Sequence, residues 1–152
     1  GDDNDFWYIH WGNILSLSLA NHIAVEIKAK AGDPDNAYYY LYLIEGATGN
    51  NWITLRTDGT ANWKLVSRKA GSTSSTLDTG IAVTTDYVIL RIELHTHGSD
   101  HAHFYIDNVE TANSPHSTDI PASYLEPRLQ VYNYEAQVNT FDIDYITVKQ
   151  DR

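Results

Sequence analysis

Two residue types, cysteine and methionine, are missing from this chain, and it also lacks a long apolar run. The 152 residues include no cysteine, which excludes a disulfide framework, a thiolate metal site and a cysteine nucleophile. They include no methionine either, not even at position 1, so we expect a processed product or a piece of something longer. No apolar run approaches the roughly 20 residues that a membrane span requires, and we predict no span.

Basic residues are also scarce. Lys and Arg number 10 against 20 Asp and Glu, which gives a formal net charge of −10 at pH 7. Such a charge repels phosphate backbones and anionic lipid surfaces, and no stripe of Lys or Arg offsets it. We therefore expect neither nucleic acid nor an anionic membrane as a partner.

What the chain does have is a period-two alternation of apolar and polar residues. This is the period of a β-strand with one face on a core, and no window carries a convincing helical stripe. The pattern predicts strands at 15–19, 23–29, 38–44, 52–57, 61–66, 87–97, 101–107, 127–134 and 138–148. Residues 68–80, rich in Ser and Thr, are predicted to form a long surface loop with at most one short strand at 76–77. The short connections predict an all-β, antiparallel domain over residues 1–152, built as two stacked sheets or as a barrel, and we favour the two-sheet sandwich.

The segment from 88 to 107 allows a hairpin register to be predicted. Alternation puts four apolar residues on one face: Val88, Leu90, Ile92 and Leu94. A loop at 98–100 pairs Leu94 with Phe104 and Ile92 with Ile106, which matches apolar side chains across the strands. The same register predicts polar pairs on the other face: His97 with His101, His95 with His103, Glu93 with Tyr105, and Arg91 with Asp107 as a salt bridge.

Four imidazoles share the polar face of this predicted hairpin, those of His95, His97, His101 and His103. Neutral imidazole is the commonest metal ligand, and His-x-His on a strand places two side chains on the same side. The four residues are therefore a candidate transition-metal site. The alternative is that they are solvent-facing polar residues near a hairpin tip, and the sequence leaves both open.

Several strings in about the last sixty residues resemble one known superfamily. They are LRIE at 90–93, FYIDN at 104–108, IP at 120–121, LEPR at 125–128 and FDIDYITV at 141–148. These strings resemble the concanavalin A-like lectin/glucanase superfamily, which commonly carries an FYIDG strand, a short Pro turn and a last strand of the DYVRV kind. Asn108 replaces the usual turn Gly. The resemblance implies a jelly-roll sandwich, a fold that hosts lectins, glycosidases, lyases, adhesins and virion proteins.

The resemblance also implies a metal ion and argues against catalysis. In the glucanase branch the Asp of the last strand helps to hold a structural Ca²⁺, which maps to Asp144, with the aspartates at positions 2, 3 and 5 as further candidate ligands. The Glu-x-Asp-x-Glu strand of the retaining glucanases is absent from the chain. The Arg-x-Glu-Leu-Arg strand of the alginate-lyase branch is echoed only in part at 91–95, where His95 replaces the second Arg. We therefore expect no enzyme.

Aromatic residues with a polar tip are plentiful, with 11 Tyr and 4 Trp against 3 Phe, and such rings suit a wet binding surface. Sugars bind β-sandwiches by stacking on these rings, while polar side chains take their hydroxyl groups. The candidate ligand-binding residues are Trp7, Trp11, Trp52, Trp63, Arg91, Glu93, Tyr105, Gln130, Tyr132 and Tyr134. For each aromatic taken alone, packing in the core or across strands is the simpler explanation.

Together these observations favour a non-catalytic, lectin-like carbohydrate-binding module of a larger secreted or surface protein, with a glycan as partner. Two alternatives stay open: a structural or adhesion domain of a virion or cell surface, and a polysaccharide lyase or glycosidase with an unrecognised site. We expect an extracellular, virion or cell-surface location. A homo-oligomer is compatible with the sequence, and a stable trimer would favour the virion alternative.

Overall fold

The computed structural model describes residues 6–10, 17, 22–46, 49–70, 72, 75–95, 100–121, 124–133 and 139–151. Over these residues the chain forms strands and no helix, so none of the described segments is a helix that could cross a membrane. The strands are β1 (Phe6–His10), β2 (Ile23–Ala31), β3 (Ala37–Ile44), β4 (Trp52–Arg56), β5 (Asn62–Arg68), β6 (Ser75–Ala82), β7 (Val88–His95), β8 (His101–Ile106), β9 (Val109–Glu110), β10 (Glu126–Asn133) and β11 (Phe141–Gln150).

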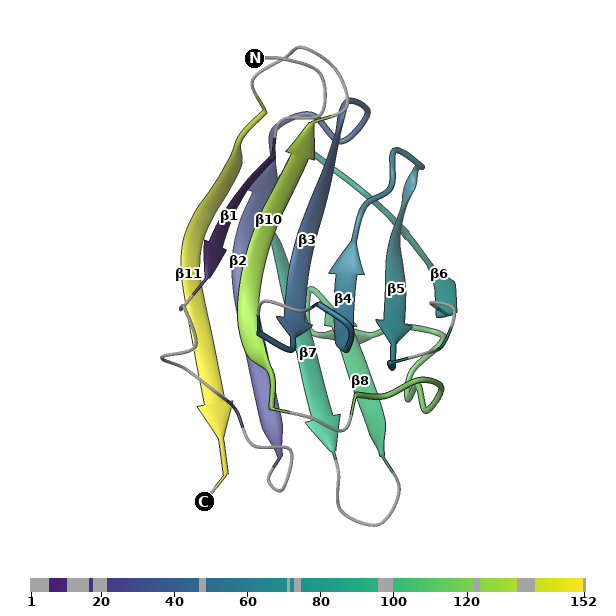
Figure 1. The fold of residues 1–152 in the computed structure, drawn as a ribbon. Coiled ribbons are helices and arrows are strands. Elements are labelled where there is room, and N and C mark those ends of the chain that lie inside the picture. The colour runs from purple at the N-terminus through teal and green to yellow at the C-terminus, as the bar shows by residue number, and fades with distance from the viewer. Residues whose placement is uncertain are drawn as a thin grey trace.

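Two antiparallel sheets are stacked face to face (Figure 1). One sheet has six strands in the order β1-β10-β3-β4-β5-β6, and the other has five in the order β11-β2-β7-β8-β9. The predicted all-β, two-sheet sandwich is therefore confirmed. The run at 38–44 forms β3, which is an interior strand of the six-stranded sheet.

The core lies between the sheets because each strand turns one row of apolar side chains inward. Buried and half-buried residues alternate strictly along β2 and β7. The predicted apolar face of β7 is confirmed, with Leu90, Ile92 and Leu94 fully buried. The opposing sheet contributes Leu41, Leu43, Ile53, Leu55, Trp63, Leu65 and Val131 to the same cluster.

The predicted register of the β7–β8 hairpin is wrong. The structure pairs Leu90 with Ile106, Ile92 with Phe104, and His95 with His101. The predicted pairs that it replaces are Leu94 with Phe104, Ile92 with Ile106, His95 with His103, Glu93 with Tyr105, and Arg91 with Asp107. This slip keeps every side chain on its predicted face, so the apolar pattern does not distinguish the two registers. His97 lies outside the described residues.

The long loop predicted at 68–80 is also wrong. Strand β5 continues to Arg68, and Ser75–Ala82 forms β6, which pairs with β5. As the edge strand of its sheet, β6 leaves many side chains exposed, which explains its Ser- and Thr-rich composition. Of the strand predicted at 15–19 only Leu17 is described, and it forms an isolated bridge with Leu125.

Candidate functional site

Most of the predicted site residues lie on the outer faces of the two sheets. Trp52, Gln130 and Tyr132 lie on the outer face of the six-stranded sheet. On the outer face of the five-stranded sheet lie Arg91, Glu93, His95, His101, His103 and Tyr105. Trp11, His97 and Tyr134 are outside the described residues.

Two of the predicted tryptophan platforms turn towards the interior instead. Trp63 is 1% exposed and belongs to the core cluster, so it is unable to stack against a ligand at the surface. Trp7 is partly buried and packs against the same cluster. The prediction of a surface role for Trp63 is wrong because its position on β5 gives it the inward parity of Leu65.

Six aromatic side chains gather on the outer face of the six-stranded sheet, and we call this surface the tyrosine face. Its members are Tyr8 on β1, Tyr132 on β10, Tyr38, Tyr40 and Tyr42 on β3, and Trp52 on β4. The register places Tyr132 directly opposite Tyr38. Trp52 pairs with Ile44, which is the outward-facing residue of β3 that follows Tyr42. Alternation along β3 thus supplies three outward tyrosines in one strand.

Five rings of the tyrosine face, from Tyr132 on β10 to Trp52 on β4, form a continuous series of ring contacts. Tyr132 stacks on Tyr38 with centroids 5.9 Å apart, and Tyr38 meets Tyr40 edge-on at 6.3 Å. Tyr40 and Tyr42 are stacked nearly parallel at 5.0 Å, and Trp52 meets Tyr42 edge-on at 5.8 Å. These are the offset and T-shaped arrangements that aromatic pairs prefer, so each ring is held by its neighbours.

Two guanidinium groups flank this series. Arg56 lies 5.9 Å from the centroid of Tyr40, and Arg128 lies 5.6 Å from that of Tyr8. Arg128 also donates from Nη2 to the carbonyl of Gly46, 3.2 Å away, and to Glu126, 3.1 Å away. The Nε atoms of both arginines are buried and have no hydrogen-bond partner among the described residues. Burial raises the pKa of Tyr40 and Tyr42, so both hydroxyl groups stay neutral donors at ordinary pH.

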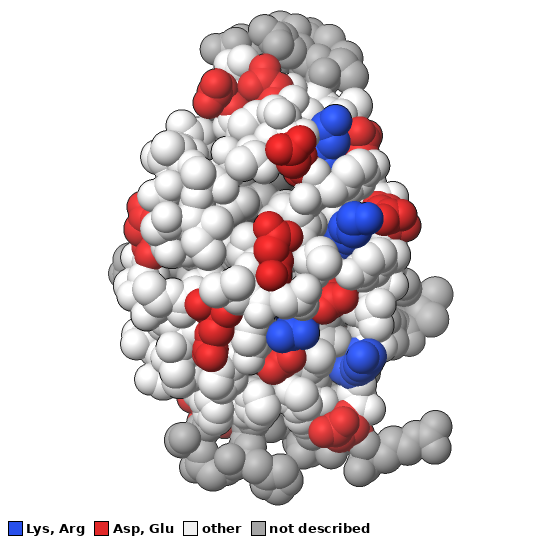
Figure 2. All heavy atoms as spheres, turned by 180° about the vertical axis from the view of Figure 1, so that it is seen from behind, with Lys and Arg blue, Asp and Glu red and all other residues white. Residues whose placement is uncertain are grey.

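On the opposite surface, side chains form rows across β2, β7 and β8. His22, which precedes β2, His95 and His101 make one row. Ala24, Glu93 and His103 make the next, followed by Glu26, Arg91 and Tyr105. Figure 2 shows acidic and basic side chains interspersed over this side of the molecule.

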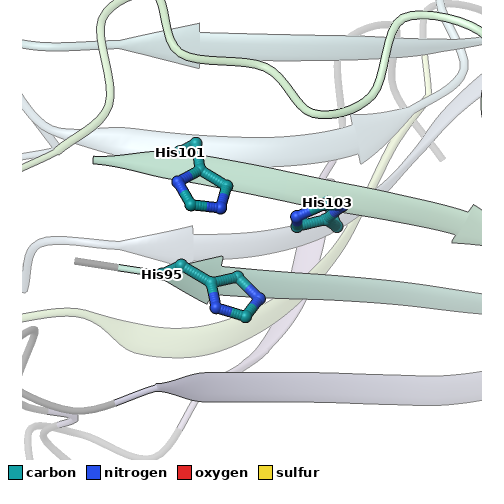
Figure 3. A group of neighbouring side chains, drawn as sticks. All are labelled: His95, His101 and His103. Carbon is teal, nitrogen blue, oxygen red and sulfur yellow. The ribbon is translucent and has the colours of Figure 1, made fainter. Parts of the chain in front are cut away.

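The histidines of this surface are in mutual contact, and we call His22, His95, His101 and His103 the histidine cluster. Figure 3 shows His95, His101 and His103. His95 stacks on His22 at 4.2 Å and on His101 at 5.0 Å, while His103 meets both His95 and His101 edge-on. One ring nitrogen from each of His95, His101 and His103 lies within 4.8 Å of the other two. Burial, followed by the charge of His22, lowers the pKa of His95 and favours neutral imidazole.

Beside the histidine cluster lies a cavity of about 290 Å³, lined in part by His22, Glu26, Arg91, Glu93 and Lys149. Arg91 stacks over the ring of Tyr105, 4.0 Å from its centroid. Its ion pairs are with Glu93 at 3.1 Å and Glu26 at 3.6 Å, so the predicted salt bridge to Asp107 is wrong. The carboxylate of Asp107 instead accepts a hydrogen bond from the backbone N–H of Ile89.

The calcium ligand predicted at Asp144 has a cation as its partner. Its carboxylate lies 2.7 Å from the ammonium group of Lys28, where the register of β11 on β2 is irregular. A calcium ion needs six to eight oxygen ligands, and a neighbouring ammonium group repels it. The described residues around Asp144 therefore do not fit calcium. The aspartates at positions 2, 3 and 5 lie outside the described residues, so the calcium site stays a prediction.

Sequence reasoning missed most of the tyrosine face and part of the histidine cluster. Tyr38, Tyr40 and Tyr42 carry an i, i+2 signal, but Tyr39 and Leu41 between them made both faces of the strand look apolar. Tyr8, Arg56 and Arg128 have no sequence signal that assigns them to this face. His22 joins the cluster only because β2 pairs with β7, a long-range contact that no local pattern encodes.

Comparisons with known proteins identify the fold. No protein-family model matches the chain, and no curated protein matches its sequence. A β-glucanase of Bacillus licheniformis matches in structure with a TM-score of 0.68 at 12% identity, over 91% of this chain and 69% of the glucanase. The carbohydrate recognition domain of Emp46p, in a metal-free form, matches with a TM-score of 0.70 at 12% identity, over 97% and 78% of the two chains.

A third structural relative is Rv0315 of Mycobacterium tuberculosis, described as an immunostimulatory antigen and pseudo β-1,3-glucanase. Its TM-score is 0.68 at 14% identity, over 95% of this chain and 69% of that protein. These likenesses confirm the predicted concanavalin A-like jelly-roll fold. They include a glucanase, a pseudo-glucanase and a carbohydrate recognition domain, so the fold by itself leaves the activity open.

Proposed function

We propose that this chain is a non-catalytic carbohydrate-binding module of a larger secreted or surface protein, and that it binds its glycan on the tyrosine face. The observation that carries the proposal is the contiguous series of rings from Tyr132 through β3 to Trp52. Tyr40 is buried in this run, but Tyr38, Tyr42, Tyr132 and Trp52 are partly exposed. Partly exposed aromatic rings on the outer face of a sheet form an amphipathic surface, which suits the apolar faces of sugar rings.

Polar groups border the rings at the positions where sugar hydroxyl groups would lie. The guanidinium groups of Arg56 and Arg128 lie against the rings of Tyr40 and Tyr8 and carry further N–H donors beside them. Gln130 lies between Tyr8 and Tyr40 in the register and offers an amide group. Stacking platforms beside fixed donors are the combination that gives a sugar site both affinity and orientation.

The distribution of carboxylates supports binding without catalysis. Among the described strand residues that project from this face, the carboxylates are Glu126 on β10 and Asp78 on β6. β10 and β6 are four strand positions apart in the sheet order, which corresponds to about 19 Å. Glycosidases of both stereochemical classes hold their two carboxylates roughly 5–9.5 Å apart. Asp78 is moreover engaged by Lys64 and Glu126 by Arg128.

A glycan array followed by affinity measurement tests this proposal. The first soluble probe is mixed-linkage β-1,3-1,4-glucan, because a lichenase for that polymer is among the structural neighbours. We expect Tyr38→Ala and Trp52→Ala each to weaken glycan binding at least tenfold. Tyr87→Ala is the matched control, because Tyr87 is 49% exposed and sits against Lys28 of the other sheet. The Tyr87→Ala variant should bind the glycan with the same affinity as the parent protein.

Three outcomes contradict the proposal. Failure to bind any glycan on the array would show that the ligand is not a carbohydrate. Loss of binding in Tyr87→Ala with full binding in Tyr38→Ala would move the site off the tyrosine face. Release of reducing ends or unsaturated products from a bound polysaccharide would show that the domain is an enzyme.

A further inference from the structure

The histidine cluster lies on the sheet opposite the tyrosine face and has no part in the proposed glycan site. Strand pairing brings it together: His95 and His101 are direct cross-strand partners, and His103 projects from the same face of β8. Figure 3 shows the three rings on one side of β7 and β8, at the end of the hairpin. Three imidazole rings in one place form a set of nitrogen ligands suited to Zn²⁺, Cu²⁺ or Ni²⁺.

The nitrogens of these three rings are spaced slightly more widely than the ligands of a bound zinc ion. A tetrahedral zinc ion with Zn–N bonds of about 2.0–2.1 Å holds its nitrogens about 3.3 Å apart. Here one ring nitrogen from each of the three half-buried side chains lies within 4.8 Å of the other two. Metal binding would therefore bring the three nitrogens closer together by rotation about side-chain bonds.

His103 already has the outer partner that metal-bound histidines require. Its Nδ1 donates to Oε1 of Glu110 at 2.5 Å, and the hydroxyl of Ser114 donates to the same oxygen at 2.6 Å. Ser114 is in turn fixed by the backbone N–H of Phe104 at 3.2 Å. A carboxylate on Nδ1 sets the tautomer and directs Nε2 towards the ion, which is the usual arrangement in zinc sites.

We propose that His95, His101 and His103 bind one divalent transition-metal ion of the zinc type, with Glu110 orienting His103. The ion has three protein ligands, and its fourth position is open to water or a ligand atom. A second ligand group, His22, Glu93 and His95, shares His95. It is the weaker site because Glu93 is ion-paired with Arg91 at 3.1 Å and His22 lies 3.4 Å from Asp151, so binding there breaks existing interactions.

The test is calorimetric titration of tag-free, chelator-treated protein with Zn²⁺. We expect one ion per chain with a dissociation constant in the micromolar range or below. His101→Ala and His103→Ala should each weaken binding at least 100-fold, and Glu110→Gln should weaken it 10- to 100-fold. His22→Ala is the matched control and should change affinity less than fivefold. Circular dichroism of each variant checks that the sandwich is intact.

Co²⁺ provides an independent readout, since tetrahedral coordination gives intense visible absorption that the His103→Ala variant should lose. Absence of one-to-one Zn²⁺ binding by the folded parent protein overturns the proposal. So does loss of binding in His22→Ala and Glu93→Gln with normal binding in His101→Ala, because the ion then sits in the other group. Trp52→Ala should bind Zn²⁺ normally, which separates this test from that of the glycan site.

Discussion

The imidazole of His116 and the hydroxyl of Ser67 lie 2.8 Å apart in the interior and join the two sheets. Ser67 belongs to β5, whereas His116 forms a backbone bridge with Ala102 of β8. The hydroxyl proton of Ser67 goes to the carbonyl of Thr118, 2.8 Å away, so Nε2 of His116 is the donor to Ser67. Both side chains are buried, which makes this pair a structural link and not an accessible nucleophile with its base.

This link predicts a loss of stability in mild acid. Burial lowers the pKa of His116 below its ordinary value of 6.5, so the unfolded chain binds the proton more readily than the folded chain does. The contribution to stability is complete above pH 6.5 and declines as the pH falls below that value. His116→Gln keeps a donor for Ser67 but does not titrate. We expect this variant to lose less stability than the parent protein between pH 7.5 and 5.

Thermal unfolding followed by circular dichroism at a series of pH values measures this difference. His95→Gln is the control, because the pKa of His95 is also lowered but its side chain is only half-buried. Parallel pH profiles for His116→Gln and the parent protein would rule out His116 as the titrating group.

A second prediction concerns the contact of Gly32 with Thr140, where the chain leaves β2 and approaches β11. The N–H of Gly32 donates to the carbonyl of Thr140 at 2.9 Å. A Cβ atom on Gly32 would lie 2.7 Å from Thr140 Oγ1, 3.0 Å from its carbonyl oxygen and 3.1 Å from its nitrogen. Because two of these atoms are backbone, Gly32→Ala should destabilise the fold by about 1–3 kcal/mol in urea unfolding.

Thr140→Ala provides the means to dissect that effect. In the double variant the Oγ1 contact is gone while both backbone contacts stay, so Thr140→Ala should recover only part of the loss. Full recovery would show that the side chain alone is responsible. An unchanged denaturation midpoint in Gly32→Ala would mean that the two segments separate at no cost.

The sequence predicts the faces of strands better than their partners. Alternation placed Leu90, Ile92 and Leu94 correctly, because burial imposes a strict period of two. The alternation did not determine the β7–β8 register. A shift of this kind keeps every side chain on its face, and both registers pair apolar residues with apolar residues. A local pattern also carries no information on strand order, which is what brings β10 next to β3 and His22 next to His95.

The site residues were harder to predict than the strands, because their positions also depend on which strands pair. Trp52 and Trp63 look equivalent in the sequence, as aromatic residues in neighbouring predicted strands. Only the pairing of β4 with β5 reveals opposite parity: Trp63 lies between the sheets, and Trp52 faces outward beside Tyr42. Composition therefore indicated a binding surface rich in aromatics but not which rings compose it.

These two tryptophans give the last prediction, in which the same substitution affects stability at one position and glycan binding at the other. Trp63→Ala removes a fully buried indole and should cost about 3–5 kcal/mol of unfolding free energy. Trp52→Ala removes a half-buried ring, so it should cost much less stability while weakening glycan binding at least tenfold. Urea unfolding and affinity measurement on both variants provide the comparison. If Trp52→Ala proved the more destabilising of the two, the inward and outward assignments on β4 and β5 would be reversed, and the tyrosine face would belong to the core.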